Sequence, residues 1–495
     1  MAVHVAGLVA VVAFYGVILL TGIFAARKSK KLEKKCTGRK SEVAIVGGRN
    51  INIVVGVFTM TATWVGGGYL MGTAEAVYLP TRGLVWASGP FAYLVNFILG
   101  ATMSIILDLS PVVSILISAA VSIIYTVLGG LYAVAYTDVI QLSFIFVSLW
   151  LCIPFMFLSP AVTDLSQTIH LNESNVDSWI GEVKLEDAGK WTDDFLMMAL
   201  GGLSSQSFHQ RILAAASSSK AQVSCFAAAL FSFIMGIPSV IIGAAAASAD
   251  WNQTEYGLPP PYERGEAGNV LPLALSYITP NWVSVLGIGS VAAAVMSSMD
   301  SALLSSASMF TQNIYKATLR KQASDRELQW VTRICVLLVG LAGTGLAFNK
   351  SSMLALMLLT TDLLYCIVTP QLVCVVHLRS ANCYGAISGY TVALLLRVLS
   401  GEPALGIPPV ILYPGWREED GVITQYFAFR TLIAFISLAV VVLVSCLVEL
   451  GFNHNVIPQS WDVLDVFKKK IEAEEDEKPT PLSHEGKNIV LNTAL

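Results

Sequence analysis

The stretch from Thr59 to Tyr69 constrains this chain most, because it places three consecutive glycines inside an apolar segment long enough to cross a membrane. Glycine costs about 1 kcal/mol per residue in a helix interior relative to alanine, so we predict that the helix is interrupted at Gly66-Gly67-Gly68. Inside a bilayer, unpaired backbone is tolerated only where it lines a cavity or a bound ion. A broken membrane helix is typical of secondary transporters, whose unwound carbonyls coordinate the driving cation near the bilayer midplane.

Composition indicates a polytopic membrane protein, since 55% of the 495 residues are hydrophobic and only 13% are charged. The net charge of −4 does not indicate whether the chain binds nucleic acid, because the charges lie in predicted loops and in the tail. The eight cysteines fall mostly in apolar segments without metal-ligand spacing, so we predict neither a disulfide framework nor a metal site. No phosphate-binding glycine loop and no catalytic Ser/His/Asp order is present, which argues against an enzyme.

Apolar segments of roughly 20 residues predict twelve membrane spans, within an all-α membrane domain of residues 1–450. The first span is followed by a strongly basic loop, so the positive-inside rule places the N-terminus outside. The predicted spans are residues 5–26, 51–74, 84–107, 112–134, 136–159, 193–210, 222–249, 283–312, 331–349, 352–377, 382–400 and 429–451. Residues 451–495 are predicted to form a disordered cytoplasmic tail with trafficking signals, and its end has the form of a PDZ-domain ligand.

Spans can be assigned an orientation by counting from the N-terminus or back from the C-terminus. The two counts give inconsistent orientations where the span 84–107 meets the span 112–134. No lysine or arginine occurs between Arg82 and Lys184, so nothing in this window fixes the topology. One interpretation is a re-entrant or kinked segment, and the other is that a spanning helix is missing.

Glycosylation sequons support the count from the C-terminus, because all three fall in loops that this count places outside. They begin at Asn172, Asn252 and Asn349. Asn252 lies in a proline-rich loop and is the strongest candidate, whereas Asn349 is close to a predicted helix end.

We single out three of the acids in or at the end of apolar spans, where each costs about 2.5 kcal/mol or more at mid-bilayer and marks an ion site or pathway by default. They are Glu75, Asp300 and Asp362. The alternative for each is a structural acid that caps a helix or joins two helices. Around Asp300 the hydroxyls of Ser297, Ser298 and Ser301 favour an oxygen cage for Na⁺ over a transition-metal site.

Several runs of residues closely resemble choline transporters of the sodium:solute symporter family. They include VGGR (46–49), FTMTATWVGGGY (58–69), GTAEAVY (72–78), VLGGLYAVAYTDV (127–139), DWNQT (250–254), AAVMSSMDS (293–301), NIY (313–315), PQLVCV (370–375) and GEP (401–403). The likeness extends over nearly the whole chain up to the tail. It implies a LeuT-like fold of two inverted five-helix repeats, with about 13 spans expected for the family against the 12 predicted here.

The resemblance also implies the residues that hold the coupling ion. Sodium ligands would be the carbonyls of Thr61 and Trp64 together with Ala294, Ser297 and Ser298, with Asp300 close by. Transport would depend on Na⁺ and Cl⁻, although no chloride ligand can be named. The family likeness further implies choline as substrate, the plasma membrane and synaptic vesicles of cholinergic nerve terminals as location, and homo-oligomers and trafficking adaptors as possible partners.

The substrate pocket is where the chain departs from the family. Choline is held by aromatic faces through cation–π attraction, about 2 kcal/mol or more when desolvated, and Trp64 and Tyr93 remain for this purpose. Ser205 and Met357, by contrast, stand where the family carries tryptophans. A further family tryptophan lies on a helix that is absent after Gly100, at the same place as the disagreement in orientation.

Three functional hypotheses therefore remain open. The first is sodium-coupled uptake of choline or a related small cation. The second is a symporter of the same family with a changed substrate, because the loss of aromatic faces spares the sodium ligands. The third is a transport-incompetent membrane subunit that retains or titrates a full-length partner.

Overall fold

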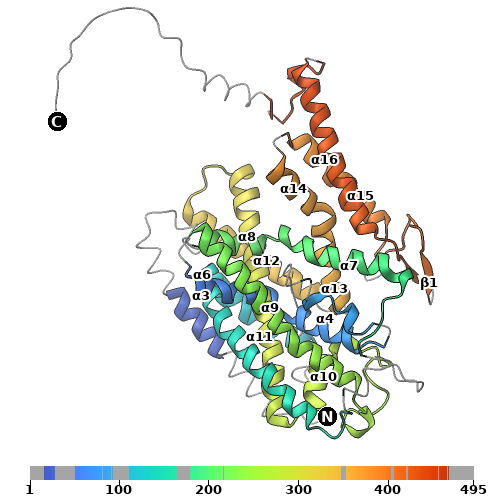
Figure 1. Cartoon of the computed structure of the whole chain (residues 1–495). Coiled ribbons are helices and arrows are strands. Elements are labelled where there is room, and N and C mark those ends of the chain that lie inside the picture. Colours follow the sequence, from blue (N-terminus) through green and yellow to red (C-terminus); the bar gives the residue numbers. More distant parts are fainter. Residues whose placement is uncertain are drawn as a thin grey trace, which may run out of the picture.

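The structure is a computed structural model and is almost entirely helical (Figure 1). It describes residues 16–27, 51–80, 82–90, 92, 111–163, 165, 179–215, 217–346, 353–378, 380–402, 406–419, 422–454, 456–464 and 466–467. One short hairpin is present in these ranges, in which β1 (Arg417–Glu419) pairs antiparallel with β2 (Val422–Thr424). The predicted all-α membrane class is confirmed.

The long helices form the body of the molecule: α6 (Pro111–Phe157), α9 (Ser218–Ala247), α11 (Asn281–Met309), α12 (Asp325–Leu346) and α16 (Phe429–Asn453). Shorter helices complete it: α3 (Ile53–Trp64), α4 (Gly67–Tyr78), α7 (Ala188–Gly201), α8 (Gln206–Ala214), α10 (Val270–Tyr277), α13 (Met353–Leu363), α14 (Thr369–His377) and α15 (Cys383–Leu399). Figure 1 shows α15 and α16 side by side at the edge of the bundle, where they are in contact.

Turns of other helix types link these elements. The 3-10 turns are η2 (Leu84–Trp86), η3 (Leu185–Asp187), η4 (Gly202–Ser204), η5 (Trp251–Gln253), η6 (Ala267–Asn269) and η10 (Gln459–Trp461). Two π-helical segments, η7 (Phe310–Leu319) and η8 (Leu364–Val368), continue α11 and join α13 to α14.

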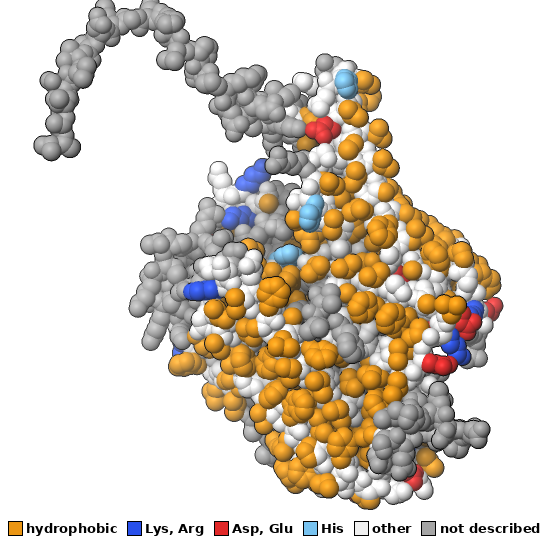
Figure 2. Space-filling model, viewed as in Figure 1, with side chains coloured by type: hydrophobic (Ala, Val, Ile, Leu, Met, Phe, Trp, Pro, Cys, Tyr) orange, Lys and Arg blue, Asp and Glu red, His pale blue; other side chains and the backbone are white. Residues whose placement is uncertain are grey.

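Six helices in the described ranges are long and apolar enough to cross a membrane, and the bent pair α3 and α4 adds a seventh. The predicted spans 222–249, 283–312, 331–349, 352–377 and 429–451 coincide with such helices. The span predicted at 382–400 forms α15, which has only 17 residues. Figure 2 shows the matching surface, with hydrophobic side chains over most of the visible face and charged ones near its margins.

Two predicted boundaries are wrong. The spans predicted at 112–134 and 136–159 form one continuous helix, α6, of 47 residues. Asp138 lies within this helix, and its carboxylate accepts the hydroxyl hydrogen of Thr59 on α3. Conversely, the span predicted at 193–210 is interrupted, since α7 and η4 end before Ser205, whose backbone is extended, and α8 begins after it.

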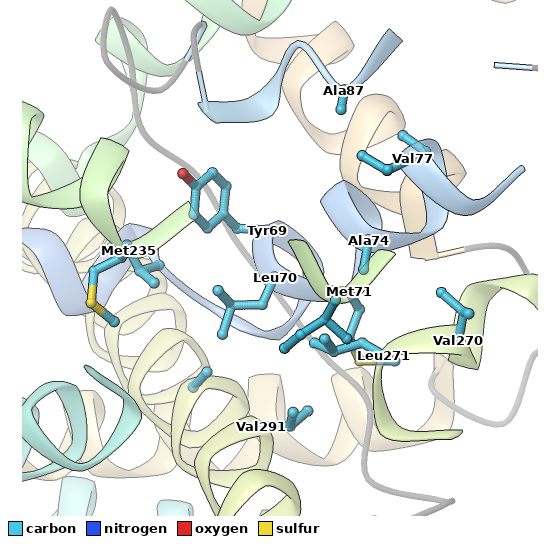
Figure 3. Close-up of a cluster of buried hydrophobic side chains, with 14 of the residues drawn as sticks. Tyr69, Leu70, Met71, Ala74, Val77, Ala87, Met235, Val270, Leu271 and Val291 are labelled. Atoms are coloured by element: carbon cyan, nitrogen blue, oxygen red, sulfur yellow. The ribbon is translucent and has the colours of Figure 1, made fainter. Parts of the chain in front are cut away.

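Helix α4 lies at the centre of the molecule, and all twelve of its residues are buried. Figure 3 shows Tyr69, Leu70 and Met71 in a cluster of apolar side chains contributed by several helices. Helix α9 approaches closely because of two glycines: a Cβ at Gly236 would lie 2.3 Å from the Tyr69 hydroxyl, and one at Gly243 would lie 2.7 Å from a carbonyl oxygen of α4. Small residues of this kind let membrane helices pack without a hydrophobic driving force.

The beginning of the predicted tail is folded against the last two helices, α15 and α16. The ring of Phe467 stacks on Phe452 with centroids 4.7 Å apart, and Tyr384 donates to the Asp462 carboxylate at 2.9 Å. Residues 468–495, as well as the window 93–110 where the two counts of orientation disagree, lie outside the described residues.

Candidate functional site

The predicted break in the helix is present, at Val65 and Gly66, where α3 and α4 meet at an angle of 52°. The amide of Val65 makes the last helical hydrogen bond, to the Thr61 carbonyl at 2.8 Å. The extended backbone of Gly66 then passes directly over α11, because a Cβ on Gly66 would lie 1.9 Å from the Ser298 hydroxyl oxygen and 3.6 Å from the Ala294 carbonyl. A glycine is therefore required here by close approach.

Buried oxygen atoms gather around this break. The Ser297 hydroxyl lies 3.0 Å from the carbonyl oxygen of Ala62 and 3.0 Å from that of Ala294. The hydroxyls of Thr61 and Ser298 are buried and have no hydrogen-bond partner within the part of the chain that the structure describes. A buried hydroxyl without a partner costs about 1–3 kcal/mol. Two such groups beside a helix break form a set of hard oxygen donors suited to a small cation such as Na⁺.

The structure thus brings three of the predicted sodium ligands, Ala294, Ser297 and Ser298, together where α11 meets α3 and Gly66. The carbonyl of Thr61, the fourth, accepts the Val65 amide in the last turn of α3. Asp300 is fully buried on α11, three residues from Ser297 and so on the same side of the helix. Sequence reasoning missed the Ala62 carbonyl as a member of this cluster. Which carbonyl oxygen faces α11 depends on the residue at which α3 ends, and the sequence does not show that residue.

A second buried network lies beside this cluster and was not predicted. Asp138 on α6 accepts a hydrogen bond from Thr59. Thr63 lies 3.1 Å from the Ser301 hydroxyl, which also accepts from an Arg211 nitrogen at 2.6 Å. Arg211 directly follows the span predicted at 193–210, yet its side chain is buried and joins α8 to α11. The available signal was Asp138, an acid inside an apolar segment.

The substrate candidates are only partly brought together. Trp64 is buried, and its ring lies 5.1 Å from that of Phe208 at an angle of 45°. Ser205 is buried at the interruption before α8, with its hydroxyl 2.7 Å from that of Ser207. Phe208 was not predicted, because nothing in the sequence showed that α8 turns back towards the break.

Two further substrate candidates cannot be placed. Tyr93 lies outside the described residues, and Met357 lies in α13 at a position where only the backbone is described. Among the described aromatic side chains beside the break, the Trp64 and Phe208 rings are in contact.

Asp362 belongs to a buried ionic cluster, as the structural alternative for this acid predicted. Its Oδ2 atom lies 2.7 Å from an Arg397 nitrogen and 2.9 Å from an Arg430 nitrogen. Arg430 also pairs with Asp194 at 2.9 Å and with Asp193 at 3.5 Å. This outer cluster ties α7, α13, α15 and α16 together, and its arginines were overlooked because they stand at helix ends.

Further hydrogen bonds connect the charged groups of the outer cluster to neighbouring residues. Asp193 accepts the amide and the hydroxyl of Thr431 at 2.7 and 2.6 Å. Arg397 donates to the Gly401 carbonyl at 2.8 Å and to the Glu402 carboxylate. Glu75, the third acid in the apolar spans, is buried in the last turns of α4.

The loop after α9 carries the glycosylation candidate Asn252, which is exposed within η5. The same loop is held by Tyr256, which donates to Glu266 at 2.8 Å, and burial together with this hydrogen bond raises the pKa of Tyr256 to about 12. Asn172 and Asn349 lie outside the described residues.

Comparisons with known proteins find relatives over nearly the whole chain. High affinity choline transporter 1 of Homo sapiens is 40% identical over 98% of this chain and 92% of its own length. High-affinity choline transporter 1 of Torpedo marmorata is 41% identical over 95% of this chain and 90% of its own length. A solved structure of a Na⁺-coupled sialic acid symporter, only 17% identical, covers 89% of this chain with a TM-score of 0.61, and 98% of that chain is covered. This likeness confirms the LeuT-like fold.

The alignment with the human relative also bears on the length of the chain. It spans 540 positions, whereas 98% of this 495-residue chain supplies about 485 residues. About 55 positions of the alignment therefore have no residue here, which is the size of one membrane helix with its loops.

The family model described as the sodium:solute symporter family matches residues 91–393, a range that includes α11 and the interruption at Ser205. This match, and the identity over nearly the whole length of the relatives, show that the chain belongs to the sodium:solute symporter family.

Proposed function

We propose that this chain takes up choline across the plasma membrane in symport with sodium. The observation that carries the proposal is the contact of Gly66 with Ser298 at the helix break, with the unpartnered hydroxyls of Thr61 and Ser298 beside it. These groups would replace the hydration shell of Na⁺. Because they lie on α3 and α11, a bound ion would fix the relative position of the two helices.

The substrate follows from the aromatic groups next to the ion. A quaternary ammonium cannot donate a hydrogen bond from nitrogen, so ring faces are the groups that recognise it. Trp64 ends α3 directly beside the break, and Phe208 lies against it. Sodium binding and cation binding would thus share one segment of backbone, which accounts for coupling between them.

Further proposals rest on the relatives. We propose chloride dependence, a presynaptic location at the plasma membrane and in synaptic vesicles, glycosylation at Asn252 and then Asn172, homo-oligomers, and trafficking adaptors that bind the tail. The exposure of Asn252 supports its modification.

The test is uptake of labelled choline by cells that express this chain, with and without sodium, normalised to protein at the cell surface. Replacing both Ser297 and Ser298 by alanine should abolish most of the sodium dependence, because it removes two hydroxyls from the cluster. Ser306→Ala, an exposed position on the same helix, is the matched control. Unchanged sodium dependence in the double variant would disprove the assigned site.

Two other functions have support. The hydroxyl pair Ser205 and Ser207, where the family has a tryptophan, would suit a more polar substrate. The roughly 55 alignment positions that lack a residue suit a subunit that associates with a full-length relative. Co-expression separates these cases: suppression of the relative's uptake indicates a subunit, and sodium-dependent uptake of another solute indicates a changed substrate.

A further inference from the structure

Helix α8 turns a mostly polar face towards the interior. Its buried residues recur at intervals of three and four along one side of the helix: Ser207, Gln210, Arg211 and Ala214. Apolar burial has no preferred direction, whereas a hydrogen bond requires a partner at a defined distance and angle. The position of α8 therefore depends on the partners of its polar side chains as well as on apolar packing.

The two long side chains of this face both reach α11. An Arg211 nitrogen donates to the Ser301 hydroxyl at 2.6 Å, and the Gln210 amide donates to the Ser308 hydroxyl at 3.3 Å. The other terminal nitrogen of Arg211 donates to the Gln210 side chain at 3.2 Å, so the two links are joined. The carboxylate of Asp138 on α6 adds an electrostatic attraction to Arg211.

The same face of α11 carries a residue of the ion site. Ser297 precedes Ser301 by four residues and Ser308 follows it by seven, so the three hydroxyls lie along one side of the helix. Ser297 donates to the Ala62 carbonyl, next to the helix break. A shift of α11 that accompanies ion binding at Ser297 would therefore move Ser301, one turn further along, and with it Arg211.

On its other side, α8 contacts the substrate candidate. Phe208 precedes Arg211 by three residues, and its ring lies 5.1 Å from that of Trp64, the last residue of α3. Because Phe208 and Arg211 belong to one short helix, the bond of Arg211 to α11 positions the Phe208 ring against Trp64. Helix α8 thus connects the ion site on α11 with the aromatic contact at the end of α3.

We propose that Arg211 is a positioning residue that couples sodium binding to choline binding. Sodium fixes α11 against the break, and Arg211, bonded to Ser301, then holds α8 where the Phe208 ring and Trp64 together face the ammonium group. Arg211 acts through these neighbours and not by contact with the ion or the substrate. The inference rests on the proposed function and deepens it, since it names the link between the two ligands. By thermodynamic linkage, choline tightens sodium binding by the same factor.

The experiment measures equilibrium binding of labelled choline to the purified full chain in lipid nanodiscs, at saturating sodium and with sodium replaced by potassium. The ratio of the two dissociation constants is the coupling factor, which we expect to be about 5–150 for the unmodified chain. Ser301→Ala removes the acceptor of Arg211 and should lower the factor to about twofold or less, with sodium-free affinity changed less than about twofold. A loss of sodium affinity or a smaller folded fraction does not alter this ratio at saturating sodium.

A second variant tests the guanidinium itself. Arg211→Lys keeps the charge near Asp138 but replaces the planar fork that bonds both Ser301 and Gln210, so it should lower the factor as well. In the Ser301→Ala background the same change should have no further effect, because the bond is already lost. Ser305→Ala is the matched control, since this buried hydroxyl on α11 bonds to the Ala302 carbonyl of its own helix at 3.1 Å.

The possible results separate the coupling role from the proposed function. An unchanged factor in Ser301→Ala overturns the inference and leaves the proposed function intact. Equal losses of choline affinity with and without sodium also overturn it, because they indicate a purely structural role for the bond. So does a further loss when Arg211→Lys is added to Ser301→Ala, since Arg211 would then not act through Ser301. Choline binding to the unmodified chain that is absent or does not respond to sodium contradicts the proposed function itself.

Discussion

The two buried polar clusters of this molecule differ in how completely their groups are paired. The inner network, which lies beside the oxygen atoms at the helix break, joins Asp138 and Arg211, yet the Oδ1 atom of Asp138 and the Nε atom of Arg211 have no hydrogen-bond partner within the described ranges. In the outer cluster, by contrast, Asp362 accepts from two arginines and from Cys366. The Asp362 carboxylate in the outer cluster is thus fully hydrogen-bonded, whereas the inner network contains a carboxylate oxygen and a guanidinium nitrogen without a hydrogen bond among the described residues.

This difference corresponds to the roles of the helices involved. The outer cluster joins α7, α13, α15 and α16 through multiple short ion pairs, so separation of these helices would expose several buried charges at once. The inner network joins α3, α6, α8 and α11 through single hydrogen bonds. The polar links among the helices around the break are thus weaker individually than the ion pairs of the outer cluster.

The largest effect is expected for Asp362→Asn. It leaves the guanidinium groups of Arg397 and Arg430 without their shared counter-charge, and breaking a buried pair costs about 3–5 kcal/mol. The purified variant should therefore unfold at a much lower temperature than the unmodified chain. Glu186→Gln, which removes the exposed partner of Arg417, should cost less than about 1 kcal/mol. Equal losses in the two variants would show that the outer cluster does not hold the helices together.

Some features of the fold and the site could be predicted from local sequence. The break at Gly66 follows from the cost of three glycines in one helix, and Ser297 and Ser298 follow from hydroxyls next to a buried acid. Both depend on residues close together in the chain. Resemblance to the family added Thr61 and Ala294 to the same cluster.

Features that depend on distant residues could not be predicted. Phe208 reaches Trp64 only because the chain breaks at Ser205, and no local pattern indicated that break. Arg211 reads as a cytoplasmic anchor by the positive-inside rule, which considers charge and not burial. The hydrogen bond between Asp138 on α6 and Thr59 also joins residues 79 positions apart, so local sequence could not predict it.

The next largest effect is expected for Gly66→Ala, because the added methyl group would lie 1.9 Å from the Ser298 hydroxyl oxygen. Overpacking of this kind costs about 1–3 kcal/mol, and the helix break should shift away from α11. Thermal unfolding and sodium-dependent uptake measure the two consequences. Ser298→Gly in the same chain should restore stability by making room, but it should not restore sodium dependence. Additive losses in the double variant would contradict the close approach.

A smaller loss is expected for Asp138→Asn, which sharpens the comparison between the two clusters. The asparagine oxygen can still accept from Thr59, and Arg211 keeps its bonds to Ser301 and Gln210 but loses the nearby charge of Asp138, so the cost should be about 1–3 kcal/mol. Thermal unfolding beside Asp362→Asn is the measurement. If Asp138→Asn destabilises the protein as much as Asp362→Asn does, the inner network is not the looser one.

The smallest effect is expected for Phe208→Leu, which removes a ring from the proposed cage and keeps an apolar side chain of similar size. A cation–π contact contributes about 0.5–2 kcal/mol, so inhibition of uptake by choline should weaken about two- to thirtyfold. Inhibition by its uncharged carbon analogue should change less, because a neutral ligand has no cation–π attraction to the ring face. Phe231→Leu, which breaks a similar aromatic pair with Phe58 at 5.6 Å, is the matched control and should affect both ligands alike. If Phe208→Leu also weakens both ligands equally, the Trp64 and Phe208 rings do not recognise the charge, and a changed substrate becomes the better explanation of this pocket.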